Sequence, residues 1–246
     1  MRALSASEVL RIWEQGSARS LLDRALLLLG RAEPDADWNA LAALPIAARD
    51  RRLAELRAAT FGEPMPLSAR CPACEEALEF SITAEQIGWG ERVSDERWLA
   101  PLEVRHGDAL VRYRLPSSID VARAAAEESD DAEGRLIEAC IVEAVVNGDS
   151  VPASALPEAA RASVAAAIAA ADPEGDVSLD LGCPACGERW SMLFDIVTVF
   201  WLELSQRAKR LLQEVDALAR VYGWREADVL CLSAQRRAIY VEMALT

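Results

Sequence analysis

The sequence is poor in residues that enzymes use for acid-base chemistry. Its 246 residues include one histidine, His106, and only one of the 26 basic residues, Lys209, is a lysine. A Ser-His-Asp triad would have to use His106, which stands beside Gly107 in an expected hairpin turn, and no GxSxG nucleophile motif accompanies it. The Walker loop and the GxGxxG dinucleotide motif are also absent. We therefore expect a protein that is not an enzyme.

Long apolar runs and excess positive charge are lacking too. The longest apolar run near the N-terminus, residues 25–29, is too short to span a bilayer, and no secretory signal pattern is present there. The formal net charge is -14, so the average surface field repels the phosphates of nucleic acids. We expect a cytoplasmic protein that does not enter membranes and whose partners are proteins.

What the sequence does contain is a duplicated cysteine motif. The tetrapeptide CPAC occurs at residues 71–74 and again at residues 183–186, and a shift of 112 positions also places Leu67 on Leu179. In both copies the apolar residues after the second cysteine alternate with polar ones, which is the period of a strand with one buried face. Each copy therefore predicts a strand, a tight knuckle and a returning strand.

The spacing of these cysteines favours a structural metal. One CxxC knuckle supplies two thiolates and a closed tetrahedral zinc site needs four, so we predict a single structural Zn²⁺ bound by Cys71, Cys74, Cys183 and Cys186. Thioredoxin-like redox use and plain disulfides are the alternatives, but a redox CxxC normally lies between a strand and a helix. A catalytic zinc would need an open position and usually histidine or carboxylate ligands.

The other two cysteines have a different setting. Cys140 and Cys231 lie in apolar stretches that read as helices, where buried free thiols are common. We expect both to be core residues.

The fold class that follows is α+β, with a mostly helical body and a small antiparallel zinc-ribbon sheet formed by the two sequence-distant CPxC hairpins. We expect one composite domain and not independent units. Its segments are an N-terminal helical segment (residues 1–62), the first half of the ribbon (63–82), an inserted hairpin with helices (83–177), the second half of the ribbon (178–194), and a long helix followed by a helix-turn-helix pair (195–246).

Capping residues and the spacing of apolar residues predict where the helices lie in the sequence. Ser5 and Glu8 form a capping-box pattern before the first helix, and Gly30 with Pro34 predicts the end of the second. Further predicted helices cover residues 45–60, 117–128, 131–146 and 157–171, and a strand pair is expected within residues 98–115. The pair is placed so that it could extend the sheet of the ribbon.

The longest predicted helix covers residues 195–222. It carries apolar residues 4, 3, 4, 3 and 4 positions apart, at Leu204, Ala208, Leu211, Val215, Leu218 and Tyr222. This heptad seam needs a helical partner. The N-terminal helices of the same chain are favoured over an intermolecular coiled coil, because the seam is shorter than four heptads.

Three parts of the sequence resemble a known family: residues 44–53 (LPIAARDRRL), the paired CPAC knuckles, and residues 222–242 at the C-terminal end. Together they are similar to proteins encoded with contractile phage tails and phage-tail-like contractile injection systems, related to the T-even-type phage baseplate hub assembly proteins. Small baseplate assembly proteins with a similar C-terminal ending generally lack the zinc ribbon.

The resemblance implies a non-enzymatic role in building the baseplate or hub, as an assembly chaperone or as a minor component that is incorporated into the particle. Baseplate or hub proteins would be its partners. The C-terminal motif has its own physical interpretation, because mixed aromatic and arginine surfaces are frequent interface anchors. We predict partner contacts at Trp224, Arg225, Arg236, Arg237 and Tyr240, with the arginines near the outer edge. The alternative is that Trp224 and Tyr240 are plain core residues.

Two other functions are compatible with a zinc ribbon. A nucleic-acid-binding or regulatory adaptor would need a basic ribbon face, whereas acidic residues outnumber basic ones near the knuckles. They are Glu75, Glu76, Glu79, Asp180 and Glu188, against Arg70 and Arg189. A metal-dependent hydrolase would need an exchangeable metal position, and the acidic run at residues 127–131 is more typical of a solvated helix junction.

Overall fold

The computed structural model describes residues 1–89, 98, 100–126 and 131–245. It contains helices and small antiparallel sheets, which confirms the α+β class. The elements are α1 (Ala6–Gly16), α2 (Leu21–Ala32), α3 (Trp38–Ala42), α4 (Ile46–Phe61), β1 (Met65–Arg70), β2 (Ala77–Ile82), η1 (Glu85–Ile87), β3 (Leu102–His106), β4 (Ala109–Tyr113), α6 (Ser118–Ala126), α7 (Ala132–Cys140), β5 (Ile141–Val146), β6 (Asp149–Ser150), η2 (Ala153–Ala155), α8 (Glu158–Ala171), β7 (Ser178–Gly182), β8 (Arg189–Leu193), α9 (Ile196–Tyr222), α10 (Glu226–Cys231) and α11 (Ala234–Leu245).

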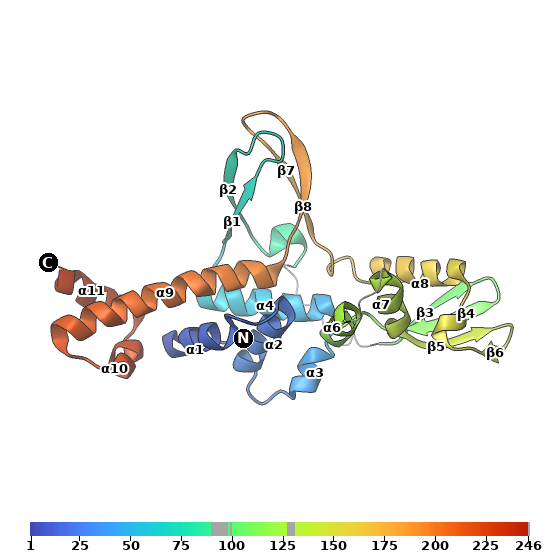
Figure 1. Cartoon of the computed structure of the whole chain (residues 1–246), viewed down its shortest axis with the longest axis horizontal. Helices are drawn as coiled ribbons and strands as arrows, with labels where there is room; N and C mark the ends of the chain where they lie inside the picture. The colour runs from blue at the N-terminus through green and yellow to red at the C-terminus, as the bar shows by residue number, and fades with distance from the viewer. Residues whose placement is uncertain (90–97, 99, 127–130, 246) are drawn as a thin grey trace. The chain divides into compact units, whose positions relative to one another are not determined.

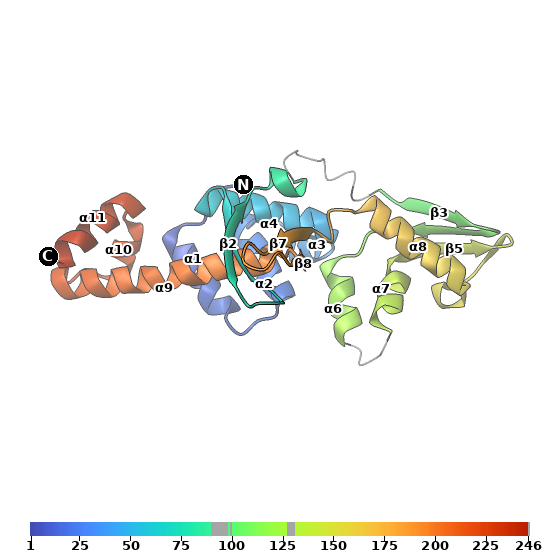
Figure 2. The same cartoon turned by 90° about the horizontal axis from the view of Figure 1, so that it is seen from above.

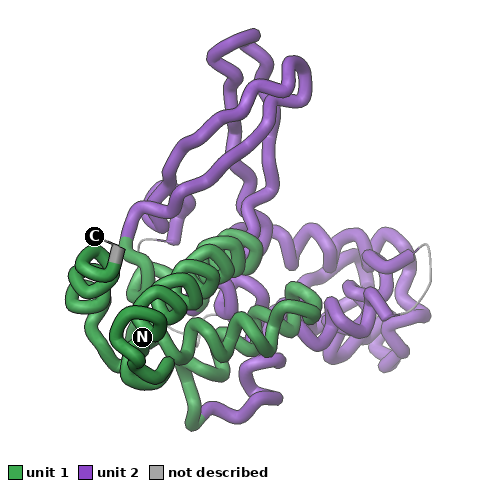
Figure 3. The backbone as a smooth tube through the Cα atoms, turned by 60° about the vertical axis from the view of Figure 1, so that its left-hand side comes forward, with its two compact units in different colours: residues 1–35, 53–62, 196–246 green, residues 36–52, 63–195 purple. Residues whose placement is uncertain are grey.

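The chain divides into two compact units, coloured separately in Figure 3. Unit 1 comprises residues 1–35, 53–62 and 196–246, and unit 2 comprises residues 36–52 and 63–195. Unit 1 is built from the two ends of the chain and is helical in its described residues, whereas the strands belong to unit 2. Helix α4 contributes its first turns to unit 2 and its remainder to unit 1.

Unit 1 is organised around α9, which spans 27 residues and is about 40 Å long at 1.5 Å per residue. Helices α1, α2, α10 and α11 pack against it, and the last two fold back at its end in Figure 1. Of the predicted seam, Leu204, Ala208, Leu211 and Leu218 are buried. The predicted packing of the N-terminal helices on α9 is therefore confirmed for α1 and α2, whereas the packing of α10 and α11 on α9 was not predicted.

The N-terminal helices show one close approach to α9. The predicted capping box at Ser5 and Glu8 is present. At the end of α1, a Cβ added to Gly16 would clash with Cη2 of Trp201, so glycine allows this close contact. Helix α2 ends at Ala32, between Gly30 and Pro34, as predicted. A glycine inside a helix costs about 1 kcal/mol, which the burial of the leucine face of α2 offsets.

In unit 2 the inserted segment forms its own four-stranded antiparallel sheet in the order β3-β4-β5-β6. Helix α8 lies along this sheet in Figure 2, and Val111, Tyr113 and Ala144 pack with Ala160 and Val164 of α8 in one apolar cluster. The predicted strand pair is confirmed as β3 and β4, but it does not extend the ribbon.

One predicted helix is partly wrong. Residues 131–146 were expected to be helical throughout, yet the helix ends at Cys140 and residues Ile141–Val146 form β5, paired with β4. This stretch is rich in β-branched residues, which favour strands, and a neighbouring strand was available to satisfy its backbone groups. Residues 127–130, which include the end of another predicted helix and most of the acidic run, lie outside the described residues.

The two cysteine motifs each form a hairpin, as predicted. Strand β1 pairs with β2, and β7 pairs with β8, both antiparallel. Figure 1 shows the two hairpins beside each other in unit 2, with their tips close together. The single ribbon sheet is wrong, because each hairpin is a separate two-stranded sheet. Each strand pairs with its own hairpin partner, and the two knuckles meet through their cysteine side chains.

Candidate metal centre

Each knuckle is closed by the same pair of backbone hydrogen bonds. In the first, the Cys71 N–H donates to the Glu76 carbonyl at 3.0 Å and the Glu75 N–H donates to the Cys71 carbonyl at 2.9 Å. The second repeats them 112 positions later, from Cys183 to Glu188 at 2.8 Å and from Gly187 to Cys183 at 2.9 Å. Glu75 and Gly187 occupy equivalent places and both have left-handed backbone, with φ of 61° and 80°. The duplication therefore extends to backbone conformation.

The two knuckles bring four sulfur atoms together. The Sγ atoms of Cys71, Cys74, Cys183 and Cys186 all lie within 4.8 Å of one another. The contacts from Cys71 to Cys186 and from Cys74 to Cys183 measure 3.6 Å each, and both join different hairpins. A tetrahedral zinc with Zn–S bonds of about 2.3 Å places its sulfurs about 3.8 Å apart. The cluster therefore has the size of a four-thiolate metal site.

Burial differs within each knuckle. Cys71 and Cys183 are buried, whereas Cys74 and Cys186 are exposed. Burial raises the pKa of Cys183, but backbone N–H groups of Cys186 and Ala185 outweigh it and lower the pKa to about 7. The backbone N–H of Glu76 lowers the pKa of Cys74, yet the neighbouring sulfurs of Cys186 and Cys183 raise it to about 12. Thiolates this close to one another repel, so four of them need a cation among them.

Below the knuckles the hairpins are supported by a small apolar base. Met65 at the start of β1 is fully buried, and its cross-strand partner Ile82 is 9% exposed. Phe194, which follows β8, packs edge-on against Trp89 with ring centroids 5.8 Å apart. The faces between base and tip are only half-buried. Each hairpin is therefore held at its base by side-chain packing and at its tip by the sulfur cluster.

The surroundings of the cysteines help to distinguish a structural metal site from a redox pair and from a catalytic zinc. Strands, not helices, follow both knuckles, as the sequence predicted, and this setting differs from that of a thioredoxin-like redox pair. The ligand set contains sulfur alone, without the histidine or carboxylate ligands that catalytic zinc usually has. His106 lies at the end of β3 and its Nδ1 is 2.8 Å from the Ser163 hydroxyl of α8, which ties the hairpin turn to that helix.

The C-terminal residues predicted to contact a partner fall into two groups. Trp224 stacks on Tyr222 at 4.9 Å and meets Tyr240 edge-on at 4.9 Å, so the three half-buried rings form one cluster. Arg225 and Arg236 are exposed. The cluster therefore combines packing within unit 1 with partly accessible aromatic surface.

Arg237 belongs to neither group, and its predicted place at the outer edge is wrong. It is 2% exposed, its Nε donates to Glu214 of α9, and its Nη1 donates to the Leu232 carbonyl at 3.0 Å. Because α11 packs on α9, the residue next to Arg236 in sequence faces inward. The two remaining cysteines also differ: Cys140 is buried, as predicted, with its pKa raised to about 11 by burial, but Cys231 is exposed, so its predicted core position is wrong.

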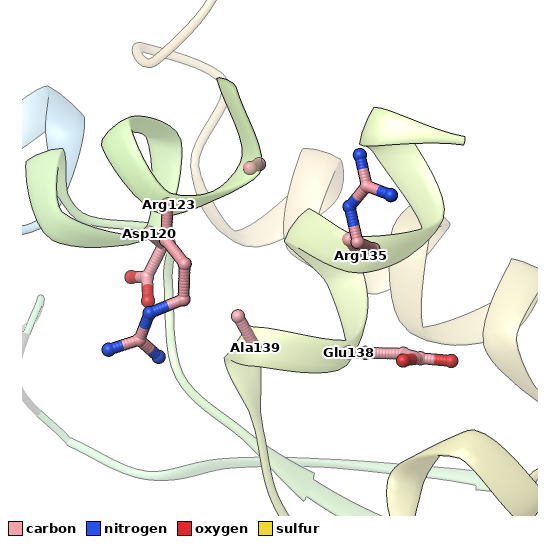
Figure 4. Close-up of a pocket in the computed structure, with 6 residues that line it drawn as sticks. Asp120, Arg123, Arg135, Glu138 and Ala139 are labelled. Atoms are coloured by element: carbon pink, nitrogen blue, oxygen red, sulfur yellow. The ribbon is translucent and has the colours of Figure 1, made fainter. Parts of the chain in front are cut away.

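A hollow lies between α6 and α7 (Figure 4). It has a volume of about 300 Å³ and is lined by Asp120, Arg123, Ala124, Arg135, Glu138 and Ala139. Both carboxylates already have partners, since Asp120 accepts from Arg114 at 2.6 Å and Glu138 from Arg161 at 3.2 Å. Burial raises the pKa of Asp120, but Arg114 and Ser117 outweigh it and lower the pKa to about 2. These groups stabilise the fold and do not form an acid-base pair.

Comparison with protein families shows the family to which the chain belongs. The model of the family described as T4 bacteriophage base plate protein matches residues 32–201, which is more than half of the chain. The chain belongs to this family. Comparison with curated proteins and with solved structures gives no match. The predicted relationship to baseplate proteins is confirmed, and the matched region contains both cysteine knuckles.

The family match does not include the C-terminal helices. It ends within α9, so α10 and α11, which carried part of the sequence resemblance, lie beyond it. Within the described part of the chain, no helix combines the length and apolar character needed to cross a membrane.

Proposed function

We propose that this baseplate-family protein is a non-enzymatic assembly chaperone or minor structural component of the baseplate or hub of a contractile phage-tail-like particle. It acts by binding other baseplate proteins. The observation that carries the proposal is the family match over residues 32–201. The sulfur-only cluster and the partnered carboxylates of the hollow between α6 and α7 support a structural role over catalysis.

The proposal includes one structural Zn²⁺ bound by Cys71, Cys74, Cys183 and Cys186. Four thiolates from two CxxC knuckles fill a tetrahedral shell and leave no position open, which is the arrangement of structural zinc. When bound, the metal would neutralise neighbouring thiolates and tie the two hairpin tips together. The acidic side chains around the knuckles support a protein partner over a nucleic-acid partner.

The partner-binding surface that we propose is the C-terminal end of unit 1, comprising Trp224, Arg225, Arg236 and Tyr240. Aromatic and arginine side chains that are partly accessible and held in place by packing are frequent anchors of protein interfaces. Arg237 supports this surface from beneath through its buried ion pair and would not contact the partner itself.

The decisive experiment is co-expression of the tagged protein with baseplate proteins of a contractile phage-tail-like particle, followed by affinity purification. We expect a baseplate protein to co-purify with the wild type and to be lost from Arg236→Glu. Arg105→Glu, which changes an exposed arginine of unit 2, is the matched control and should retain the partner. Equal recovery with Arg236→Glu would place the interface elsewhere, and recovery of no baseplate protein by the wild type would reject the proposed role.

The metal is tested separately. Protein purified without chelator should contain one zinc per chain by elemental analysis, and Cys71→Ser should lose it. Cys231→Ser, which changes an exposed cysteine outside the cluster, should keep it. A wild type without metal would remove zinc from the proposal and leave the baseplate role untouched.

A further inference from the structure

Two of the sulfur contacts in the cluster join one hairpin to the other. The pairs in contact at 3.6 Å are Cys71 with Cys186 and Cys74 with Cys183. Each pair joins the two hairpins, and each consists of one buried and one exposed cysteine. An exposed thiol is thus accessible to a solute on each hairpin, and a buried thiol of the opposite hairpin lies against it.

We propose that the four thiols are also a modification site for small hydroperoxides, at which oxidation joins Cys71 to Cys186 and Cys74 to Cys183 as two disulfides. The disulfides would connect the same two hairpin tips as the metal. The inference is independent of the baseplate role, because it rests on the sulfur geometry alone.

The chemistry balances with hydrogen peroxide as the oxidant. The thiolate of exposed Cys186 attacks one peroxide oxygen, the O–O bond breaks, and the cysteine becomes a sulfenic acid while the departing hydroxide takes up a proton to form water. The thiolate of Cys71 then attacks the sulfenic sulfur, which forms the S–S bond and expels a second hydroxide that is also protonated to water. Cys74 and Cys183 react in the same way with a second peroxide, and any bound Zn²⁺ is released.

The geometry favours disulfides between hairpins over disulfides within one knuckle. An S–S bond of about 2.05 Å requires the sulfurs of each contacting pair, now 3.6 Å apart, to approach by about 1.5 Å. Each knuckle is in turn fixed by its own two backbone hydrogen bonds and by a strand on either side. Redox-active CxxC pairs instead open a helix, which neither knuckle does.

The two hairpin tips would therefore be connected in either of two chemical forms. Thiolates and metal would hold the hairpins in reducing surroundings, and two disulfides would hold them in oxidising surroundings, where thiols do not persist. Because both forms connect residues 71–74 to residues 183–186, the hairpins remain tied when the metal is lost.

The test uses the full-length protein, a slight excess of hydrogen peroxide, alkylation of remaining thiols, and a tryptic digest without reductant analysed by mass spectrometry. Trypsin releases residues 71–92 and residues 162–189 as the two knuckle peptides. We expect them to appear as one cross-linked species that has lost four hydrogens and separates on reduction. Cys140 and Cys231 fall in other tryptic peptides and should remain free to be alkylated.

Each other outcome overturns the proposal. Separate knuckle peptides, each with an internal disulfide, would show pairing within knuckles, and sulfinic acids or unreacted thiols would show that no disulfide forms. The pairing itself is resolved with two double variants. Cys74→Ser with Cys183→Ser keeps the contacting pair and should cross-link, whereas Cys71→Ser with Cys183→Ser keeps only the two exposed cysteines and should cross-link at least several-fold more slowly. Equal rates would refute the assigned pairs.

Discussion

Arg237 offers the sharpest test of how unit 1 is stabilised. Arg237 belongs to α11, and only 2% of its side chain is exposed. Its guanidinium donates to Glu214 of α9 and to the Leu232 carbonyl. Replacing it with alanine would leave the carbonyl without this donor and would remove one of the two cations beside Glu214. Arg236, its neighbour in sequence, is exposed and serves as the matched control.

The expected loss can be estimated from the environment of Glu214. Breaking a buried ion pair by removing one partner costs about 3 to 5 kcal/mol of unfolding free energy. Glu214 retains Arg207 at 3.2 Å and is 16% exposed, so the lower end, about 3 kcal/mol, applies. For a chain of this size, that corresponds to a fall in melting temperature of about 6 to 12 °C.

Thermal and urea unfolding, followed by circular dichroism, measure this loss. Arg237→Ala should melt well below the wild type, Arg236→Ala should melt within about 1 °C of it, and Arg237→Lys should lie between because lysine lacks the planar guanidinium. Replacing Arg237 and Glu214 together by leucine should recover much of the stability, since no buried charge is left alone. If Arg237→Ala and Arg236→Ala unfold alike, the buried pair does not hold α11 to α9.

Three further outcomes test other parts of the molecule. Removal of the proposed zinc by a chelator under reducing conditions should speed amide hydrogen exchange in both hairpins together, with α9 unchanged; exchange in one hairpin alone would contradict a shared site. Burial and Glu174 raise the pKa of Asp172 to about 6. The folded state then holds its proton more tightly than the unfolded chain, so stability should fall by at most about 3 kcal/mol as the pH rises from about 4 to about 6. Asp172→Asn should remove that fall in a urea series, and an unchanged pH profile would oppose this assignment. Gly16→Ala should cost about 1 to 3 kcal/mol because the added Cβ would clash with Trp201, while the Cβ added by Gly182→Ala would meet nothing within 4 Å, so that this variant should be nearly neutral; equal unfolding midpoints would refute the contact.

The hairpins could be predicted from the sequence because their signals are local and repeated. A CxxC turn between alternating apolar residues specifies both strands, and the copy 112 positions away specifies them again. The long helix was equally accessible, since Leu204, Ala208 and Leu211 lie on one seam that had to be covered. Signals of this kind depend on residues within a few turns or one hairpin of each other.

The wrong predictions concern residues whose structure depends on contacts with residues that are distant in the sequence. Ile141–Val146 follows a helix without an intervening glycine or proline, and only the neighbouring strand β4 makes it a strand. The burial of Arg237 depends on Glu214, 23 positions earlier on another helix, and no local pattern shows which way α11 is rotated. The sulfur pairing between hairpins was likewise out of reach, because the sequence predicts that two knuckles meet but not which cysteines touch.

The separation of the two hairpin sheets shows what the cysteines contribute energetically. A two-stranded hairpin is at best marginally stable alone, and these two share no backbone ladder, so their apolar base and sulfur tips must hold them together. Bringing together tips that are 112 residues apart costs about 4 kcal/mol of chain entropy. Structural zinc in small peptides supplies about 10 to 16 kcal/mol, which exceeds that cost. The cluster is complete only after residue 186 has been synthesised, so we infer that the inserted sheet and α8 can form first and that the proposed metal would then fix the ends of the insertion against each other.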